Sequence, residues 1–314
     1  MSLFNMKSKD ITATLRDLDA SEYSRIKTRS SMRKGTRPWE VVNTTAGLDP
    51  NQPWIGLEWE NGFCSRAAYE KAVDFVWASY HYVTVDAEGP GPWFGEFTFS
   101  PQNLDTFNNG ATPFHGLLNF MHDNDLRMPL SGSDLEVPEE GAAWEDPSPH
   151  PEHGPRPSPS AAWCTTCRTW HDSGSSTASD RERVEEYEDD DDLRHGWGIH
   201  ANISTPRSRA GMASTEQNRI TSAMNNALQS LDYAQRDDVF GRDPYGWCYS
   251  MSNGTARWWE FKLFRTTDDK DEIATIERTI NGLVKMLEYF TDGGVSMSRA
   301  QTYNTLADSA GAGS

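Results

Sequence analysis

The sequence has few cysteines and no long hydrophobic run. No stretch approaches the roughly 18 consecutive apolar residues of a membrane-spanning helix, so we expect no membrane segment. Its 4 cysteines are scattered over 314 residues, which argues against a disulfide framework and favours a reducing compartment. The charged first residues are not followed by the apolar core of a secretory signal. These absences together predict a cytoplasmic protein.

Positive charge and nucleotide-binding glycine loops are also scarce. The chain carries 47 acidic against 29 basic residues, a formal net charge of -18. This charge argues against nucleic acid as a partner, because neutralising phosphates requires clustered lysines and arginines. Neither G-x-G-x-x-G nor G-x-x-x-x-G-K-S/T occurs, so the sequence predicts neither a dinucleotide fold nor a P-loop. ATP held in another way stays compatible with the sequence.

Composition divides the chain into distinct segments. Residues 1–45 are polar with a basic cluster, and predict an arm that either tethers the protein or docks on an acidic partner. Residues 46–290 hold the periodic apolar segments of one main domain. Inside it, residues 131–195 are rich in Pro, Ser, Glu and Asp, which predicts a low-complexity insertion or mobile loop. Residues 291–314 are small and polar, and predict a C-terminal tail.

Four predicted strands alternate between polar and apolar side chains. Neighbouring side chains of a strand point to opposite faces, so each strand has one polar and one apolar face. The strands cover residues 54–60, 94–101, 198–204 and 259–264. Their polar faces carry Glu58, Glu60, Glu96, Thr98, His200, Asn202, Glu260 and Lys262. Glu58 and Glu60 alone would also fit the solvated face of a half-buried strand. The repetition favours a shared site for a hard cation, which oxygen ligands bind.

Helical periodicity appears between these strands. Apolar residues recur at helical spacing within residues 65–80, 113–122, 214–234 and 268–290. Ser214 and Gln217 have the spacing of a capping box. Two further strands are predicted at residues 80–86 and 248–251. This order predicts an α+β fold with a curved, mainly antiparallel sheet, helices packed on one face and the functional site on the other.

A turn rich in glycine and proline separates the strand that ends at Asp86 from the strand that holds Glu96. Strand, turn and strand predict a hairpin or a pair of neighbouring strands. Asp86 would then lie close to Glu96, as a further ligand, as an amine-binding acid or as a turn residue.

The insertion contains a spacing that zinc sites use. Cys164, Cys167 and His171 form C-x-x-C followed by a histidine, and His150 or His153 could supply a fourth ligand. No second C-x-x-C completes the pattern, so reduced, unliganded thiols in a loop are the other interpretation. The sequence therefore leaves a structural Zn²⁺ open.

Taken in order, four motifs resemble those of the amidoligase family. They are Gly-Leu-Glu-Trp-Glu from Gly56, Gly-Glu-Phe-Thr-Phe-Ser-Pro from Gly95 after Asp86, Gly-Ile-His-Ala-Asn-Ile-Ser from Gly198, and Trp-Glu-Phe-Lys-Leu-Phe from Trp259. The resemblance covers most of residues 50–290. This family belongs to the carboxylate-amine ligases of glutamine synthetase-like fold, which include the glutamate-cysteine ligases. Asn202 stands where the family usually has a second histidine, and Lys262 where it usually has arginine.

The resemblance implies an ATP- and Mg²⁺-dependent ligase that joins a carboxylate donor to an amine acceptor through an acyl phosphate. By resemblance, one Mg²⁺ site contains Glu60 and Glu96, and another contains Glu58, His200 and Glu260. The resemblance assigns catalysis to Glu58, Glu260 and Lys262, with Lys262 on the phosphate. Lysine lacks the planar fork of arginine, so other residues could share in nucleotide binding. The candidates are Asn202, Arg257 and Arg265.

Two other classes of protein fit the same residues. Asn202 and Lys262 would also be expected in a relative that kept the sheet and lost the chemistry, and that serves as a binding or structural protein. A zinc-stabilised adaptor, with the insertion as its functional part, is the other class. Some relatives place active sites between subunits, so an oligomer is compatible with the sequence.

Overall fold

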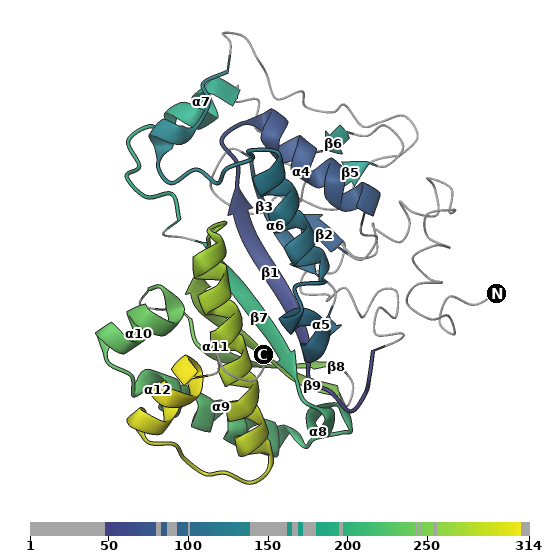
Figure 1. The fold of residues 1–314 in the computed structure, drawn as a ribbon, viewed down its shortest axis with the longest axis vertical. Helices are drawn as coiled ribbons and strands as arrows, with labels where there is room; N and C mark the ends of the chain where they lie inside the picture. Colours follow the sequence, from purple (N-terminus) through teal and green to yellow (C-terminus); the bar gives the residue numbers. More distant parts are fainter. Residues whose placement is uncertain are drawn as a thin grey trace, which may run out of the picture. The chain divides into compact units, whose positions relative to one another are not determined.

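The computed structural model describes residues 48–79, 83–86, 93–99, 101–138, 162–164, 169–171, 180–194, 197–242, 244, 246–253 and 256–308. The predicted N-terminal arm and most of the predicted insertion lie outside these residues. The fold is α+β with a mostly antiparallel open sheet, as the sequence predicts (Figure 1). No helix among the described residues is long and apolar enough to cross a membrane.

The chain forms two compact units, and β1 (Trp54–Gly62) contributes to both. The first unit contains the end of β1 from Trp59, residues up to 100 and residues 113–196. The second contains the start of β1, residues 101–112 and residues 197–314. The sequence predicted a single main domain.

In the first unit, helices and strands enclose an aromatic core. Its elements are β2 (Val83–Asp86), β3 (Phe94–Phe99), α4 (Arg66–Ser79) and α6 (Pro113–Asp123). β2 and β3 are antiparallel, with Asp86 opposite Glu96, so the predicted strand pair is confirmed. Trp59 packs edge-on against Phe114 with ring centroids 5.2 Å apart, and Phe97 is fully buried. The apolar alternation of β1 and β3 therefore supplies this core.

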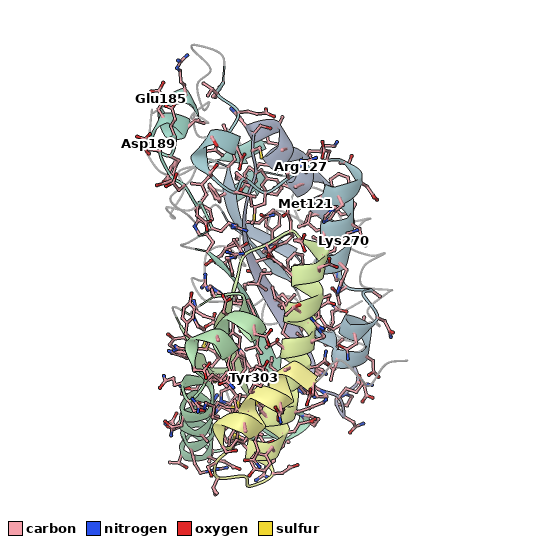
Figure 2. The ribbon with its side chains drawn as sticks, turned by 60° about the vertical axis from the view of Figure 1, so that its left-hand side comes forward. Met121, Arg127, Glu185, Asp189, Lys270 and Tyr303 are labelled. Carbon is pink, nitrogen blue, oxygen red and sulfur yellow. The ribbon has the colours of Figure 1, made fainter. Side chains whose placement is uncertain are left out.

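The first unit also includes the described parts of the predicted insertion. These are the short 3-10 helix η2 (Gly132–Asp134), the antiparallel strands β5 (Ala162–Cys164) and β6 (Thr169–His171), and α7 (Asp180–Glu185). Val184 and Leu193 are buried, so this stretch packs at its C-terminal end. Between them, the acidic run around Glu185 and Asp189 is exposed (Figure 2).

The second unit is built on the strand order β1-β7-β9-β8, with the short β4 (Gln102–Asn103) beside β1. β7 (Gly198–Ser204) and β8 (Cys248–Asn253) both run antiparallel to β9 (Ala256–Arg265). One face of these strands is apolar and buried, as the alternation predicts. It includes Ile199, Ala201, Ile203, Trp259, Phe261 and Phe264.

Helices cover this apolar face. They are α9 (Ser214–Gln229), α10 (Tyr233–Phe240) and α11 (Lys270–Thr291). The same unit contains the short helices α5 (Leu104–Asn108) and α8 (Pro206–Arg209). The indole N–H of Trp259 donates to Thr221 Oγ1 on α9, and Phe264 meets Phe240 of α10 edge-on. Asp269 caps α11 by accepting hydrogen bonds from the backbone N–H groups of Asp271 and Glu272, which confirms the predicted start of this helix.

The helix predicted over residues 214–234 is wrong in two respects. It ends at Gln229, because Asp232 caps a separate helix, α10, through a capping box with Gln235. Ser214 does not cap α9, whose N-cap is Ala213. Gln217 is instead buried, and its amide donates to the carbonyls of Met251 and Trp258. Gln217 has the spacing of a capping box, but its hydrogen bonds hold α9 on the sheet.

The predicted C-terminal tail contains a helix, α12 (Arg299–Ala307). Ser298 and Gln301 form its capping box, and Leu306 is fully buried. Tyr303, labelled in Figure 2, donates from its hydroxyl to Asp238 Oδ2 on α10 over 2.8 Å. Most side chains of this helix are polar, so its sequence lacks the apolar stripe by which a packed helix is recognised.

Candidate metal centre

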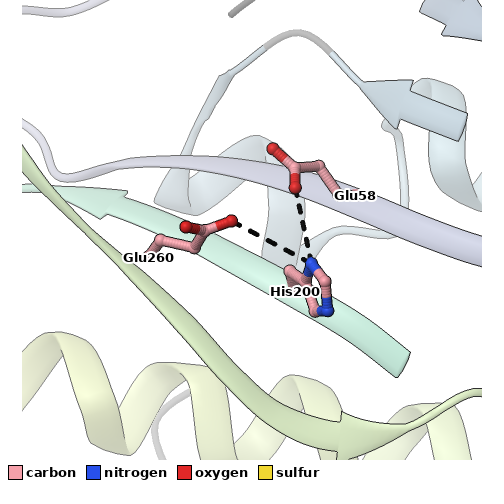
Figure 3. A group of neighbouring side chains, drawn as sticks. All are labelled: Glu58, His200 and Glu260. Atoms are coloured by element: carbon pink, nitrogen blue, oxygen red, sulfur yellow. Dashed lines mark hydrogen bonds and ion pairs between the residues drawn. The ribbon is translucent and has the colours of Figure 1, made fainter. Parts of the chain in front are cut away.

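Three polar side chains from β1, β7 and β9 converge in the second unit: Glu58, His200 and Glu260 (Figure 3). His200 Nδ1 lies 3.4 Å from Glu58 Oε2 and 4.0 Å from Glu260 Oε1. One ligand atom from each residue lies within 4.8 Å of the others. Within the part of the chain that the structure describes, this is the one group of three or more acidic, histidine or cysteine side chains with such geometry.

The strand pattern explains why these side chains meet. Glu58 alternates with Leu57 and Trp59, which are buried on the opposite face of β1. On β7, His200 and Asn202 share a face for the same reason. Asn202 is the direct cross-strand partner of Glu260, so the polar faces of β7 and β9 coincide. The sequence predicted that these residues share the sheet face opposite the helices. They are buried there, with Glu58 3%, His200 2% and Glu260 6% exposed.

A β-bulge lies beside the group. Ile199 pairs with Phe264 and Ala201 with Phe261, so three residue steps of β9 match two of β7. The extra residue falls at Lys262 and Leu263, next to His200. A bulge breaks strict alternation and redirects a side chain, and bulges are frequent near functional sites. Alternation alone could not predict it.

Lys262 lies at the edge of the group. Its Nζ is 3.7 Å from Glu260 Oε1, and its side chain is 32% exposed, so one end of the group reaches the surface. The backbone N–H of Lys262 donates to Trp247 O, and a Cβ on Gly246 would lie 2.9 Å from Lys262 Cβ. Gly246 thus leaves the space that the lysine stem occupies. Its place in a turn-rich segment was the one sequence signal for this role.

Asn202 completes the polar group. Its Nδ2 donates to Glu58 Oε1 over 3.2 Å, and the residue is 3% exposed. Its Oδ1 is buried and has no hydrogen-bond partner among the described residues. A buried acceptor without a partner costs about 1–3 kcal/mol. This oxygen is therefore an acceptor still available to a cation bound at the group.

Four other predicted site residues, Glu60, Glu96, Arg257 and Arg265, lie outside this group. Glu60 and Glu96 are not part of the group; they belong to the first unit, where Glu96 Oε1 accepts a hydrogen bond from Thr98. Arg257 donates to the carbonyl of Ala256, and Arg265 lies 3.5 Å from Glu272. The second Mg²⁺ site and the nucleotide-binding role of these arginines stay predictions.

The predicted zinc ligands fall largely outside the described residues. Cys164 and His171 lie on the paired strands β5 and β6, of which the structure describes the backbone, and Cys167 is not described. The other two cysteines, Cys64 and Cys248, lie within the described residues. Cys248 is buried, and burial raises the pKa of its thiol, so it is a neutral packing group. Cys64 is half-buried and donates to Arg127 O.

The donor chemistry fits a hard divalent cation. Two carboxylates, an imidazole and an amide oxygen are a ligand set that Mg²⁺ or Mn²⁺ accepts. Ligand atoms on opposite sides of one Mg²⁺ lie roughly 4.2 Å apart, and neighbouring ones about 3 Å, if each bond is about 2.1 Å long. The observed 3.4 Å and 4.0 Å separations from His200 fall in this range.

Fold and site together define an α+β protein with a buried Glu-His-Glu group that could hold a metal ion. No known family model matches the chain, and no curated protein sequence matches it either.

Proposed function

We propose that this protein is an ATP- and Mg²⁺-dependent ligase that joins a carboxylate to an amine. The observation that carries the proposal is the convergence of Glu58, His200 and Glu260 from three separate strands, beside the cationic Lys262. The order of the four sequence motifs supports the same class. Neither the convergence of these side chains nor the motif order selects a ligase by itself. A ligase that activates carboxylates with ATP needs a cation site with a basic group next to it, and Lys262 lies next to the three side chains.

The reaction requires activation because an amine does not displace oxide from a carboxylate. A carboxylate oxygen would attack the γ-phosphorus of ATP, which gives an acyl phosphate and releases ADP. The amine would then attack the acyl carbon, which forms the amide, expels inorganic phosphate and releases a proton. Phosphate is a good leaving group, so this two-step route lowers the barrier.

The chain's own residues would have separate tasks. Glu58 and Glu260 supply negative charge to hold the cation, and His200 contributes a neutral nitrogen, provided that its Nδ1 carries no hydrogen. Lys262, whose side chain is 32% exposed beside Glu260, would contact a phosphoryl group as a point charge. The Mg²⁺ ion, when bound, would neutralise charge on the ATP phosphates.

The test is a screen for Mg²⁺-dependent ADP release with amino acids, polyamines and peptides supplied in pairs. We expect release with at least one pair, and its loss in Glu58→Gln and Glu260→Gln, because each change removes a charge that holds the cation. Glu216→Gln is the matched control, since Glu216 pairs with Arg207 on the surface. Activity that survives in both site variants would overturn the metal assignment.

A second candidate is a binding or structural protein that lacks this chemistry. It is favoured by one observation: each buried carboxylate already has a partner in the chain, Asn202 for Glu58 and Lys262 for Glu260. Such a group could be balanced without a cation. Calorimetric titration with MgCl₂ and then with ATP separates the candidates, because this second protein would bind neither.

A further inference from the structure

We propose that Asn202 is a ligand of the cation held by Glu58, His200 and Glu260, and that its oxygen shifts the relative affinity of the site toward Mg²⁺ and Mn²⁺, compared with a second histidine at this position. This inference rests on the proposed cation site and names a residue that determines its metal specificity. It concerns one of the two positions, Asn202 and Lys262, at which the sequence departs from the amidoligase pattern.

The position of Asn202 within the group is fixed from two sides. Its Nδ2 donates to Glu58 Oε1, and its Cα is the cross-strand partner of Glu260. His200, two residues earlier on the same face of β7, approaches both carboxylates. Asn202 therefore contacts Glu58 directly and stands opposite Glu260 in the strand register.

The orientation of the amide follows from its neighbours. If its oxygen and nitrogen were exchanged, an acceptor would face the carboxylate of Glu58, which also accepts, and the hydrogen bond would be lost. The nitrogen must therefore face Glu58, and Oδ1 is the atom left without a partner among the described residues.

The unpaired oxygen belongs to an amide whose nitrogen donates to the carboxylate of Glu58. Glu58 and Glu260 supply carboxylate oxygens and no donor when ionised, so the acids cannot satisfy Oδ1. A cation satisfies acceptors of this kind together. Asn202 is buried to more than nine-tenths, so bulk water does not replace the missing partner.

The identity of this ligand affects which metal is preferred. Amide and carboxylate oxygens suit Mg²⁺ and Mn²⁺, whereas imidazole nitrogen suits Zn²⁺ and other later metals. With Asn202 the group offers three oxygen-bearing side chains and one imidazole. A second imidazole at this position would shift the balance toward Zn²⁺.

The experiment is isothermal titration calorimetry of the full chain with MgCl₂, MnCl₂ and ZnCl₂, in a Cys164→Ser, Cys167→Ser background that removes the predicted zinc ligands. We expect Asn202→Ala to weaken Mn²⁺ and Mg²⁺ binding about tenfold or more. Asn202→Asp should retain Mn²⁺ binding, since it keeps an oxygen. Asn202→His should raise the ratio of the Mn²⁺ Kd to the Zn²⁺ Kd about tenfold or more. Asn218→Ala, an exposed asparagine on α9, is the control.

The outcomes separate this inference from the proposed function. If the unsubstituted site binds neither Mg²⁺ nor Mn²⁺, the cation site itself is wrong. If it binds them and Asn202→Ala binds equally well, Asn202 is not a ligand. If Asn202→His leaves the ratio of the two Kd values unchanged, Asn202 only positions Glu58. Circular dichroism checks folding; should the alanine variant unfold, the aspartate and histidine variants carry the comparison.

Discussion

At the scale of single residues, the half-buried Arg209 on α8 is held by several partners at once, away from the metal centre. Its guanidinium lies 3.8 Å from the ring centroid of Trp54 and donates to Ser204 Oγ over 2.9 Å and to Pro50 O over 2.8 Å. It also donates to Gln52 O. Burial lowers the pKa of Arg209 to about 10, against the opposing effect of Asp49, and the group still carries its charge at neutral pH.

We therefore expect Arg209→Lys to destabilise the protein by about 2 kcal/mol, because an ammonium group can neither stack on Trp54 nor reach all these acceptors. Urea unfolding followed by tryptophan fluorescence measures the change. Arg207→Lys is the control. Arg207 is exposed and pairs only with Glu216 among its described contacts, so this variant should lose no more than about 0.5 kcal/mol of unfolding free energy. Equal effects in both variants would show that the stacked guanidinium contributes nothing special.

At the scale of helices and strands, regular periodicity was predictable and its interruptions were not. β3 and β7 follow the alternation of their sequences, β9 does so up to its bulge, and α11 follows its apolar stripe from Asp269. These segments are recognisable because one face is continuously buried. The gathering of Glu58, His200 and Glu260 follows from the same alternation.

The features that could not be predicted depend on contacts between distant segments. The bulge at Lys262 has no local signal, because it is defined by the register with β7. Gln217 has the local pattern of a cap, but its amide finds stronger partners on β8 and β9. Asn202 could be placed on the polar face, whereas its unpaired oxygen is evident only once the orientation of Glu58 is known.

Close packing of α11 on α12 gives a prediction at this scale. A Cβ on Gly282 would lie 2.6 Å from Thr305 O and 2.7 Å from Leu306 Cα, both backbone atoms. Gly282→Ala should therefore push α12 away from α11, although alanine is the better helix former by about 1 kcal/mol.

The expected result is a net loss of about 1–3 kcal/mol in stability and faster protease cleavage around residues 292–298. Lys285→Ala, on the exposed side of the same helix, is the control and should change neither quantity. A Gly282→Ala variant that is more stable than the unsubstituted protein would mean that helix propensity outweighs the close approach, and that α12 can move without cost.

At the scale of the whole molecule, the net charge of -18 influences every measurement with salts. An acidic chain repels itself, so any salt should stabilise it by screening. Under the proposed function the same charge disfavours binding of anionic ATP unless a cation accompanies it. Stabilisation by MgCl₂ is therefore informative only when it exceeds that of KCl at equal ionic strength.

We expect such an excess. About 10 mM MgCl₂ and about 30 mM KCl have the same ionic strength and should screen similarly. Binding at a single site adds about 2.7 kcal/mol when the ion is present at about 100 times its Kd, so MgCl₂ should raise the Tm by several degrees more than KCl does. Glu260→Gln should lose the additional Tm increase caused by MgCl₂, because the cation loses one of its two carboxylates. It should keep the Tm increase that both salts cause by screening, because one charge in a total of -18 hardly alters screening. Glu216→Gln removes a charge from the surface and should keep both effects. An excess that persists in Glu260→Gln would place the bound cation elsewhere on this acidic chain and would remove the physical basis of the proposed ligase site.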